Sequence, residues 1–211
     1  MGGVLGRGYH CVMLGLDGSG KTTILNRLKY GHYTSTHPTI GFNFQKVTPG
    51  LPPWDGLDFI FQIQSNGSCF HLWDVGGQDK TRPLWRSYIR DTDLILFVLD
   101  SSDRLDEAKL ELQNLMKLTE RSGPPIILIA NKQDLPGAAS LEEINTFLSS
   151  NKTASCQLLS SCGITGEGLE SLLNDVKHLV QRRKKIKNSE KSKLLSSKNI
   201  SHLSFKTLNF S

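Results

Sequence analysis

Long hydrophobic runs are missing from this sequence of 211 residues. No apolar stretch approaches the roughly 18 residues that a membrane-spanning helix needs, and the first residues lack the basic and then apolar pattern of a secretory signal. Cysteine is scarce as well, and its four positions lack the spacing of metal ligands: Cys11, Cys69, Cys156 and Cys162. We therefore expect a globular protein of the cytoplasm, whose cysteines are buried thiols rather than disulfides or a zinc site.

Acidic residues are nearly absent from the C-terminal end. Residues 182–211 contain nine of the 25 Lys and Arg and one of the 20 Asp and Glu, so their net charge is +8 and that of the remaining chain is −3. The cluster at 182–187 (RRKKIK) suits an anionic membrane surface or a nuclear import signal. It does not suit specific nucleic-acid binding, because no aromatic residues are interleaved with it. We predict a disordered or conditionally ordered basic tail over 184–211.

The rest of the chain alternates between short apolar runs and longer amphipathic segments. The runs are typical of strands that are buried on both faces, and they lie at 11–16, 69–75, 94–99, 126–130 and 157–159,. The amphipathic segments predict helices at 21–30, 103–121, 140–149 and 167–183,. This alternation predicts an α/β fold with a mostly parallel sheet and helices on both faces. The turn-rich segment 49–57 (PGLPPWDGL) separates 42–47 from 59–64, which predicts a hairpin with a long tip,.

The first motif that carries chemistry is GLDGSGKT at 15–22, which matches the phosphate-binding loop G-x-x-x-x-G-K-[ST] between a predicted strand and a predicted helix,. Lys21 is expected to reach the β- and γ-phosphates and to act in catalysis, and the Thr22 hydroxyl to ligate Mg²⁺. The helix N-terminus adds a favourable dipole. The loop alone leaves a GTPase, an ATPase and a small kinase open. Its expected nucleotide contacts are Gly15, Asp17, Gly18, Ser19, Gly20, Lys21, Thr22 and Thr23.

A second motif, NKQD at 131–134, separates these alternatives. It follows the predicted strand 126–130 at its carboxyl end, where ligands of open sheets bind,. The carboxylate of Asp134 can accept hydrogen bonds from N1–H and N2–H₂ of guanine, and adenine offers no such pair of donors. We therefore predict a guanine nucleotide bound by Asn131, Lys132 and Asp134, and the motif argues against an ATP-dependent kinase.

The third motif is WDVGGQ at 73–78. Asp74 ends a predicted strand and could hold the Mg²⁺ shell through water, the Gly77 amide could bind the γ-phosphate, and Gln78 could orient the attacking water. A tight turn would explain the glycine pair alone. It does not explain the presence of all three motifs in this order, so we expect Gln78 to be catalytic.

The segments PTIGFN at 38–43, WDVGGQDKTRPLWRSY at 73–88 and NKQDLP at 131–136 closely resemble the ADP-ribosylation factor (Arf) and Arf-like GTPases. The resemblance covers about residues 10–183 and implies a P-loop NTPase fold with a six-stranded sheet that binds GTP or GDP with Mg²⁺. The basic tail and the segments YIRDTDLILFVLDSSD and DEAKLEL are most similar to the group-four Arf-like branch.

The resemblance also implies roles for individual residues. Thr39 is the switch I threonine that joins Mg²⁺ and the γ-phosphate, and the base-contacting loop comprises Ser161, Cys162 and Gly163. An effector-binding surface is assigned to Phe42, Trp73, Trp85 and Tyr88. Trp73 could instead pack in the core, whereas Trp85 and Tyr88 have charged neighbours, and exposed aromatic residues beside Arg are typical of binding surfaces,.

In addition to the basic tail, the sequence departs from the family pattern in two places. The segment 44–72, which should form the hairpin between the two switches, has 29 residues, about twice the family's length. Residues 1–9 are too short for the family's N-terminal amphipathic helix. Gly2 is a candidate for N-myristoylation, although Gly6 stands where the pattern requires Ser or Thr,.

These features predict a monomeric molecular switch that cycles between GDP and GTP and hydrolyses GTP slowly. Its expected partners are an exchange factor, an activating protein, effectors and a membrane surface, in membrane traffic, cytoskeletal or signalling control. The alternative is a GTP-binding scaffold with little hydrolysis, which the long segment between the switches motivates.

Overall fold

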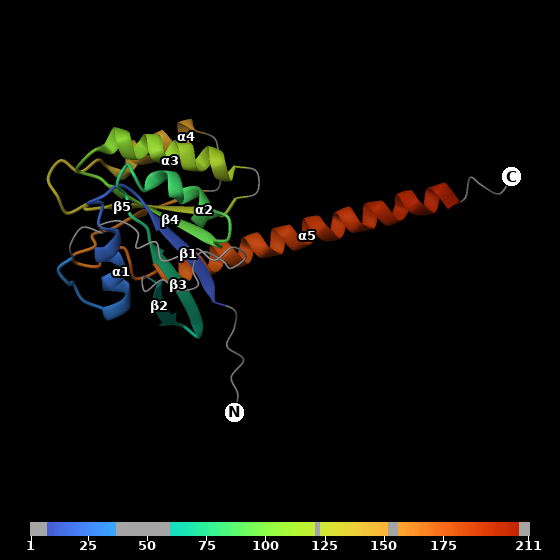
Figure 1. The fold of residues 1–211 in the computed structure, drawn as a ribbon, viewed down its shortest axis with the longest axis horizontal. Coiled ribbons are helices and arrows are strands. Elements are labelled where there is room, and N and C mark those ends of the chain that lie inside the picture. The colour runs from blue at the N-terminus through green and yellow to red at the C-terminus, as the bar shows by residue number, and fades with distance from the viewer. Residues whose placement is uncertain (1–7, 37–59, 121–122, 152–155, 207–211) are drawn as a thin grey trace, which may run out of the picture.

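The computed structural model describes residues 8–36, 60–120, 123–151 and 156–206, with Ile60, Glu190, Lys191 and 193–206 described by their backbone alone. Six strands form one sheet in the order β2-β3-β1-β4-β5-β6, in which β2 is antiparallel to β3 and the other pairs are parallel (Figure 1). The strands are β1 (Tyr9–Leu14), β2 (Ile60–Ser65), β3 (Ser68–Asp74), β4 (Leu94–Asp100), β5 (Ile126–Asn131) and β6 (Cys156–Ser160). The predicted mostly parallel sheet is confirmed.

Helices cover both faces of this sheet. Trp85 and Ile89 of α2, Leu112 of α3 and Ile144 of α4 pack on one face, where Phe97 and Leu128 of the central strands meet them. The second face is covered by α1 and α5, whose apolar side chains meet residues such as Leu96 and Ile127. The helices are α1 (Lys21–Tyr30), α2 (Trp85–Ile89), α3 (Leu105–Thr119), α4 (Leu141–Ser150) and α5 (Leu172–Lys206), with a 3₁₀ turn η1 at Arg82–Leu84.

Central strands β4 and β5 are buried at almost every position, which explains their continuous apolar sequences,. Helix α4 begins at a capping box, in which the Ser140 side chain accepts from the Glu143 N–H and the Glu143 carboxylate accepts from the Ser140 N–H,. The short elements η1 and α2 were not predicted, because a five-residue helix has too few positions to show a period.

A hairpin of β2 and β3 begins within the segment 44–72. Strand β2 pairs with β3, and two residues in the left-handed region, Asn66 (φ 46°) and Gly67 (φ 69°), connect them. An Asn-Gly pair with both φ positive is the two-residue turn that matches the twist of a hairpin. The predicted hairpin of 42–47 with 59–64, with its tip at 49–57, stays a prediction, because residues 42–47 and 49–57 lie outside the described residues.

Helix α5 differs from the prediction, because it continues to Lys206 instead of ending near residue 183. The sequence from 172 to 206 contains no glycine or proline, and a helix propagates at little cost once its first turns are fixed,. Leu172, Val176 and Val180 fix those turns in the core. The structure thus describes a helix at 184–206, where we expected a disordered or conditionally ordered tail, while 207–211 lie outside the described residues.

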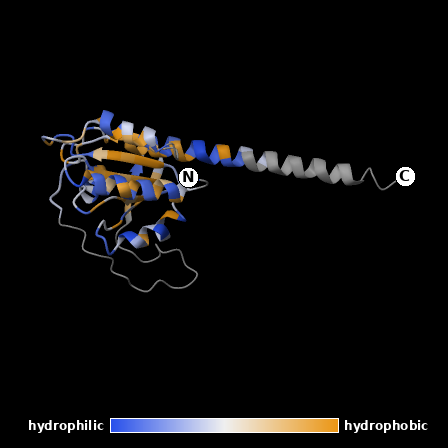
Figure 2. Ribbon diagram, turned by 90° about the horizontal axis from the view of Figure 1, so that it is seen from above, coloured by the Kyte–Doolittle hydropathy of each residue, from blue (hydrophilic) through white to orange (hydrophobic). Residues whose placement is uncertain are grey.

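Figure 1 shows the C-terminal half of α5 projecting away from the sheet, and Figure 2 shows that the described residues of this projection are mostly hydrophilic. Among the described helices, none combines the length and the apolar character needed to cross a bilayer.

Candidate nucleotide site

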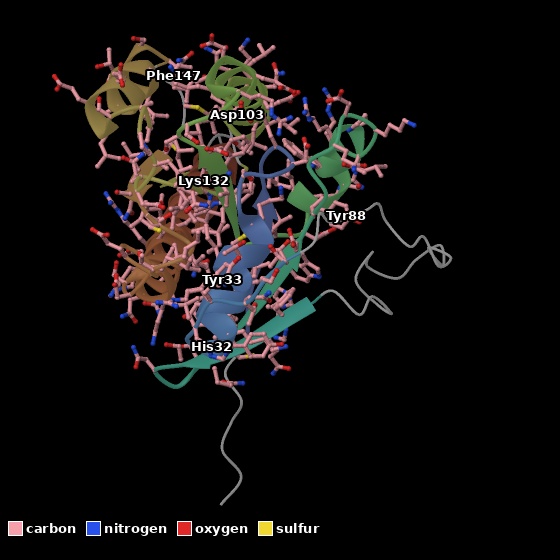
Figure 3. All side chains as sticks on the ribbon, turned by 90° about the vertical axis from the view of Figure 1, so that its left-hand side faces the viewer. His32, Tyr33, Tyr88, Asp103, Lys132 and Phe147 are labelled. Carbon is pink, nitrogen blue, oxygen red and sulfur yellow. The ribbon has the colours of Figure 1, made fainter. Side chains whose placement is uncertain are left out.

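The three sequence motifs meet at one end of the sheet. Gly15, Val75 and Lys132 directly follow the last residues of the parallel strands β1, β3 and β5, and carboxyl ends of parallel strands point the same way,. We call this the carboxyl end of the sheet. Figure 3 looks onto it, with the labelled Lys132 and Asp103 on neighbouring loops.

The phosphate-binding loop joins β1 to α1 and requires glycine. Gly20, at the start of α1, has a φ of 95°, and a Cβ there would lie 2.3 Å from Nδ2 of Asn131. The side chain of the preceding residue, Ser19, is buried, and its Oγ has no hydrogen-bond partner among the described residues. A buried hydroxyl of this kind is suited to a polar ligand in the loop.

Lys21 begins α1 with its side chain folded onto the same loop. Only 6% of the residue is exposed, and Nζ donates hydrogen bonds to the carbonyls of Gly15 (2.9 Å) and Leu16 (2.8 Å). Burial lowers the pKa of Lys21 to about 8, and attraction to Asp74 and Asp17 opposes this shift. A buried ammonium whose charged form is disfavoured would be stabilised by phosphate oxygens.

Thr22 and Asp74 bring oxygen ligands together. The Thr22 hydroxyl donates a hydrogen bond to Oδ2 of Asp74, which ends β3. Hydroxyl and carboxylate oxygens are ligands that Mg²⁺ accepts, so these residues fit the metal that the sequence predicts.

The loop after β3 lies directly on the phosphate-binding loop. A Cβ on Gly77 would lie 2.3 Å from the backbone N of Asp17 and from the carbonyl oxygen of Gly15, so no larger residue fits there. The carbonyl of Gly76 accepts hydrogen bonds from Thr81 Oγ1 (2.8 Å) and Trp85 Nε1 (3.1 Å). Gln78 follows with an exposed side chain.

Asn131 connects three loops. Its side chain is 2% exposed; Nδ2 donates to the carbonyl of Ser19 (2.8 Å), and Oδ1 accepts from the backbone N–H of Gly163 (2.9 Å) and from Ser161 Oγ (3.2 Å). The predicted base loop is therefore tied to the phosphate-binding loop through one amide. Cys162 between Ser161 and Gly163 is buried.

The next residues of the NKQD motif are more exposed. Lys132 has a φ of 63°, and its Nζ pairs with Oδ2 of Asp100 at 2.5 Å. Burial acts to raise the pKa of Asp100, but hydrogen bonds from Lys132 and Ser102 outweigh it and lower the pKa. Asp134 is exposed.

Two arginines at this end were missed in the sequence. Arg104 has a φ of 47°; Nη1 pairs with Oδ1 of Asp17 at 3.0 Å, and Nη2 donates to the Asp17 carbonyl. The hydrogen bond from Arg104 is the main cause that lowers the pKa of Asp17. The sequence contains a signal for this contact. A basic residue follows a buried strand by a few positions, and the phosphate-binding loop contains a carboxylate with which that residue can pair.

Arg82 is the second arginine that was missed in the sequence. It donates a hydrogen bond to the carbonyl of Gly77 (3.0 Å) and pairs with Asp79 (2.8 Å), Glu107 (2.7 Å) and Glu111 (3.3 Å). The loop after β3 is thereby attached to α3, which carries both glutamates.

The aromatic residues assigned to an effector surface lie differently from the prediction. Trp85 is 4% exposed and packs edge-on against Phe97, so the expected exposure of Trp85 is wrong. The hydrogen bond from its indole N–H to Gly76 allows the ring to enter the core,. Trp73 is also buried, with its ring stacked at 5.3 Å on His10. Tyr88 is half-buried, and burial raises its pKa to about 12.

Three expected functional residues, Thr39, Phe42 and Gly2, lie outside the described residues. The described part of the site therefore contains the phosphate-binding loop, the loop after β3, the NKQD motif and the base loop, without switch I.

A mostly parallel six-stranded sheet with a phosphate-binding loop after its first strand and an NKQD motif after β5 defines a small GTPase with a P-loop NTPase fold. The chain belongs to the ADP-ribosylation factor family, whose family model matches residues 3–180. It is 41% identical over 190 residues to human ADP-ribosylation factor-like protein 4A, covering 88% of this chain and 90% of that protein. The identity is 43% over 188 residues to human ADP-ribosylation factor-like protein 4C, covering 86% of this chain and 92% of that protein.

A solved structure agrees with this placement. The Arl6 BBS3 small GTPase from Trypanosoma brucei, with the bound nucleotide analogue GppNp, superimposes with a TM-score of 0.65 and 27% identity. The match covers 84% of this chain and 99% of that chain.

Proposed function

We propose that this protein is a molecular switch that cycles between GDP-bound and GTP-bound states and hydrolyses GTP slowly. The observation that carries the proposal is the hydrogen-bonding of Asn131, which joins the phosphate-binding loop to the base loop. Because one buried side chain holds both loops, the groups for the phosphates and for the base form a single site.

Guanine specificity would come from Asp134, whose carboxylate can accept from two donors of the base. A ligand without those donors would leave the carboxylate unpaired, and sites of this kind discriminate strongly. Lys132 and the loop of Ser161, Cys162 and Gly163 would complete the base pocket.

The phosphates would lie in the loop 15–22, where Lys21 and the backbone N–H groups at the start of α1 can contact them. Thr22, Thr39 and Asp74, the last through water, would hold Mg²⁺, which offsets phosphate charge when bound. The fit of Gly77 against Asp17 supports a γ-phosphate contact from the Gly77 amide, since both backbones are adjacent.

Hydrolysis would depend on Gln78 to orient water, and we propose that an activating protein accelerates it. Two arginines at the carboxyl end are already engaged with carboxylates, Arg104 with Asp17 and Arg82 with three acidic residues. An arginine supplied by a partner can be worth about 10³–10⁵ in rate.

Exchange factors and effectors complete the proposed cycle of a monomer. The basic residues 182–187 of α5 would contact an anionic membrane, each worth about 1 kcal/mol near the surface, or serve in nuclear import. Removing 182–211 should therefore reduce binding to anionic vesicles at low salt, and equal binding by the shortened chain would assign the membrane contact elsewhere.

The first test is to denature the purified protein and identify the nucleotide that is released. Near-stoichiometric GDP or GTP is the expected result. A protein that neither contains nor takes up guanine nucleotide with Mg²⁺ would contradict the proposal. Single-turnover hydrolysis with and without Gln78→Leu then separates the switch from a GTP-binding scaffold, because only a scaffold predicts equal rates.

A further inference from the structure

The peptide bond between Gly76 and Gly77 is held from one side by two buried side chains. The carbonyl of Gly76 accepts hydrogen bonds from Thr81 Oγ1 (2.8 Å) and from Trp85 Nε1 (3.1 Å). These two residues are 6% and 4% exposed, and both glycines are buried as well. A carbonyl oxygen with two donors uses both of its lone pairs, so its direction is well defined.

The direction of this carbonyl also sets the direction of the Gly77 N–H. The described residues contain no cis peptide bond, and in a planar trans peptide the C=O and the N–H point in opposite directions,. The N–H of Gly77 therefore points away from Thr81 and Trp85. Gly77 itself lies against the phosphate-binding loop, since a Cβ there would be 2.3 Å from the backbone N of Asp17 and from the carbonyl oxygen of Gly15.

Trp85 connects this peptide to the core of the protein. Its ring packs edge-on against Phe97 of β4 with 6.2 Å between the ring centroids, and Phe97 is fully buried. An indole has a single N–H, so the position of the ring decides where its acceptor, the Gly76 carbonyl, can lie. Packing on the sheet and one hydrogen bond thereby connect β4 to the loop that lies beside the phosphates.

Thr81 supplies the second donor and also closes the loop. Its hydroxyl lies 2.8 Å from the carbonyl oxygens of both Gly76 and Gln78, and its backbone N–H donates to the Gln78 carbonyl at 2.8 Å. The single hydroxyl proton is shared between these two carbonyls, whereas the indole N–H of Trp85 is directed at Gly76,. Loss of either donor should therefore weaken the hold on the peptide without abolishing it.

A structural role alone would also give these side chains hydrogen-bond partners. A buried indole N–H needs an acceptor wherever it lies, and so does a buried hydroxyl. This role accounts for the presence of the hydrogen bonds, but not for their convergence on one carbonyl beside the phosphate-binding loop. The two roles differ in what changes when a donor is removed. A structural role affects stability alone, whereas a positioning role affects how strongly the site binds a third phosphate.

We propose that Thr81 and Trp85 are positioning residues, which hold the peptide between Gly76 and Gly77 so that its N–H is directed at the γ-phosphate of GTP. Each acts through the backbone of Gly77 and not by touching the nucleotide. The inference rests on the switch proposed above and deepens it, because it identifies residues that let the site distinguish GTP from GDP. A donor that the protein already holds in place loses little freedom when it binds a phosphate.

The test compares the affinities of the full chain for GDP and for the non-hydrolysable GTP analogue GppNp, both with Mg²⁺. Thr81→Val removes the hydroxyl and nearly keeps the shape of the side chain, and Trp85→Phe removes the N–H and keeps an aromatic ring. Each variant should weaken GppNp binding about fivefold, the net worth of one hydrogen bond, and change GDP binding less than about twofold. An unchanged ratio of the two affinities in both variants would overturn the proposal, even if both variants lose stability.

Thr119 supplies a matched control elsewhere in the fold. It is 4% exposed, and its hydroxyl is also shared between two carbonyls, those of Leu115 (3.0 Å) and Met116 (3.2 Å) in α3. Thr119→Val should lower stability by an amount similar to Thr81→Val without changing the ratio of the GppNp and GDP affinities. Thr81→Ser keeps the hydroxyl and should recover most of the ratio that Thr81→Val loses. A changed ratio in Thr119→Val, or no recovery in Thr81→Ser, would contradict the positioning role.

The unmodified protein separates this inference from the proposed switch. If it takes up neither GDP nor GppNp, the switch proposal fails and this inference fails with it. If it binds both nucleotides while the variants keep its ratio of affinities, the switch proposal stands and the positioning role of Thr81 and Trp85 is refuted. Urea unfolding, measured alongside, shows which variants are folded, and Thr81→Val carries the test if Trp85→Phe does not fold.

Discussion

The two ends of the sheet hold positive charge in different ways. At the carboxyl end, the cations of Arg82, Arg104 and Lys132 pair with carboxylates, and Lys21 donates to two carbonyls. At the opposite end, where Thr92 and Asp93 precede β4, five basic residues line one cavity together with Asp93, and one of them, Lys184, pairs with it at 3.1 Å. The carboxyl end is therefore arranged by contacts within the protein that a nucleotide would partly replace. The opposite end gathers basic side chains from α2 and α5 around Asp93, the single acidic residue among the described residues that line a cavity there.

This difference implies different responses to mutation. Residues at the carboxyl end act through specific hydrogen bonds, so the effect of a change there should depend on which atom is removed and on how deeply it is buried. Four predictions test that expectation, from the largest effect to the smallest.

Asp134→Asn should reduce affinity for guanine nucleotides by at least about 100-fold, because an amide cannot accept from both donors of the base. The same variant should gain affinity for xanthine nucleotides, whose base offers an acceptor at that position. Binding of fluorescent guanine and xanthine nucleotides measures both effects. Unchanged guanine affinity would remove Asp134 from the site.

Asn131→Ala should lower the free energy of unfolding by about 3 kcal/mol, because it leaves the Ser19 carbonyl and the Gly163 N–H buried without a partner,. Urea unfolding measures the change. Asn145→Ala, at an exposed position of α4, is the control and should change stability by less than about 0.5 kcal/mol,. Similar values for the two variants would show that Asn131 does not connect the loops.

Lys21 should couple nucleotide binding to pH. Burial lowers its pKa to about 8, and bound phosphates should raise it again, so binding near pH 8 should take up roughly half a proton,. At about pH 6 the ammonium is charged both with and without bound nucleotide, so the uptake of protons on binding should vanish. Without nucleotide, the unfolded chain holds a proton that the native state lacks between about pH 8 and 10, so stability should rise with pH there.

Calorimetry in two buffers of different ionisation enthalpy measures this uptake. Lys21→Arg keeps the charge but does not titrate in this range, so its binding should not depend on the buffer. Equal buffer dependence in both proteins would assign the proton to another group.

Arg104→Ala should have the smallest effect, because the pair with Asp17 is half exposed and such pairs are worth at most about 0.5 kcal/mol,. GDP release should become about twofold faster as the loop loses this contact. The lowered pKa of Asp17 stabilises the native state above the ordinary pKa of aspartate, and this contribution disappears as pH falls through the lowered value,. Lys117→Ala, exposed on α3, is the control, and equal release rates in the two variants would contradict the prediction.

Much of the fold was predictable because the central strands have continuous apolar sequences. Prediction failed where the pattern was short or depended on distant partners. The Asn66–Gly67 turn had a local signal that was overlooked,. The burial of Trp85, in contrast, depends on the Gly76 carbonyl and the Phe97 ring, and its charged neighbours in the sequence indicated the opposite. The length of α5 was missed because a polar composition suggested disorder, although nothing in that segment breaks a helix.

The sequence by itself determined the class of ligand at the carboxyl end. The phosphate-binding loop and the NKQD motif each place their ligand-binding groups within a few consecutive residues. The order of residues in each motif therefore already defines which ligand groups it can bind. The tertiary structure alone decided which distant groups meet. Asn131 contacts Ser19 across 112 positions and Arg104 contacts Asp17 across 87, because the order of the sheet places the loops after β1, β4 and β5 side by side. A cavity lined by residues of α2 and α5 arises in the same way, since packing on one sheet brings together basic residues that lie almost 100 positions apart in the chain.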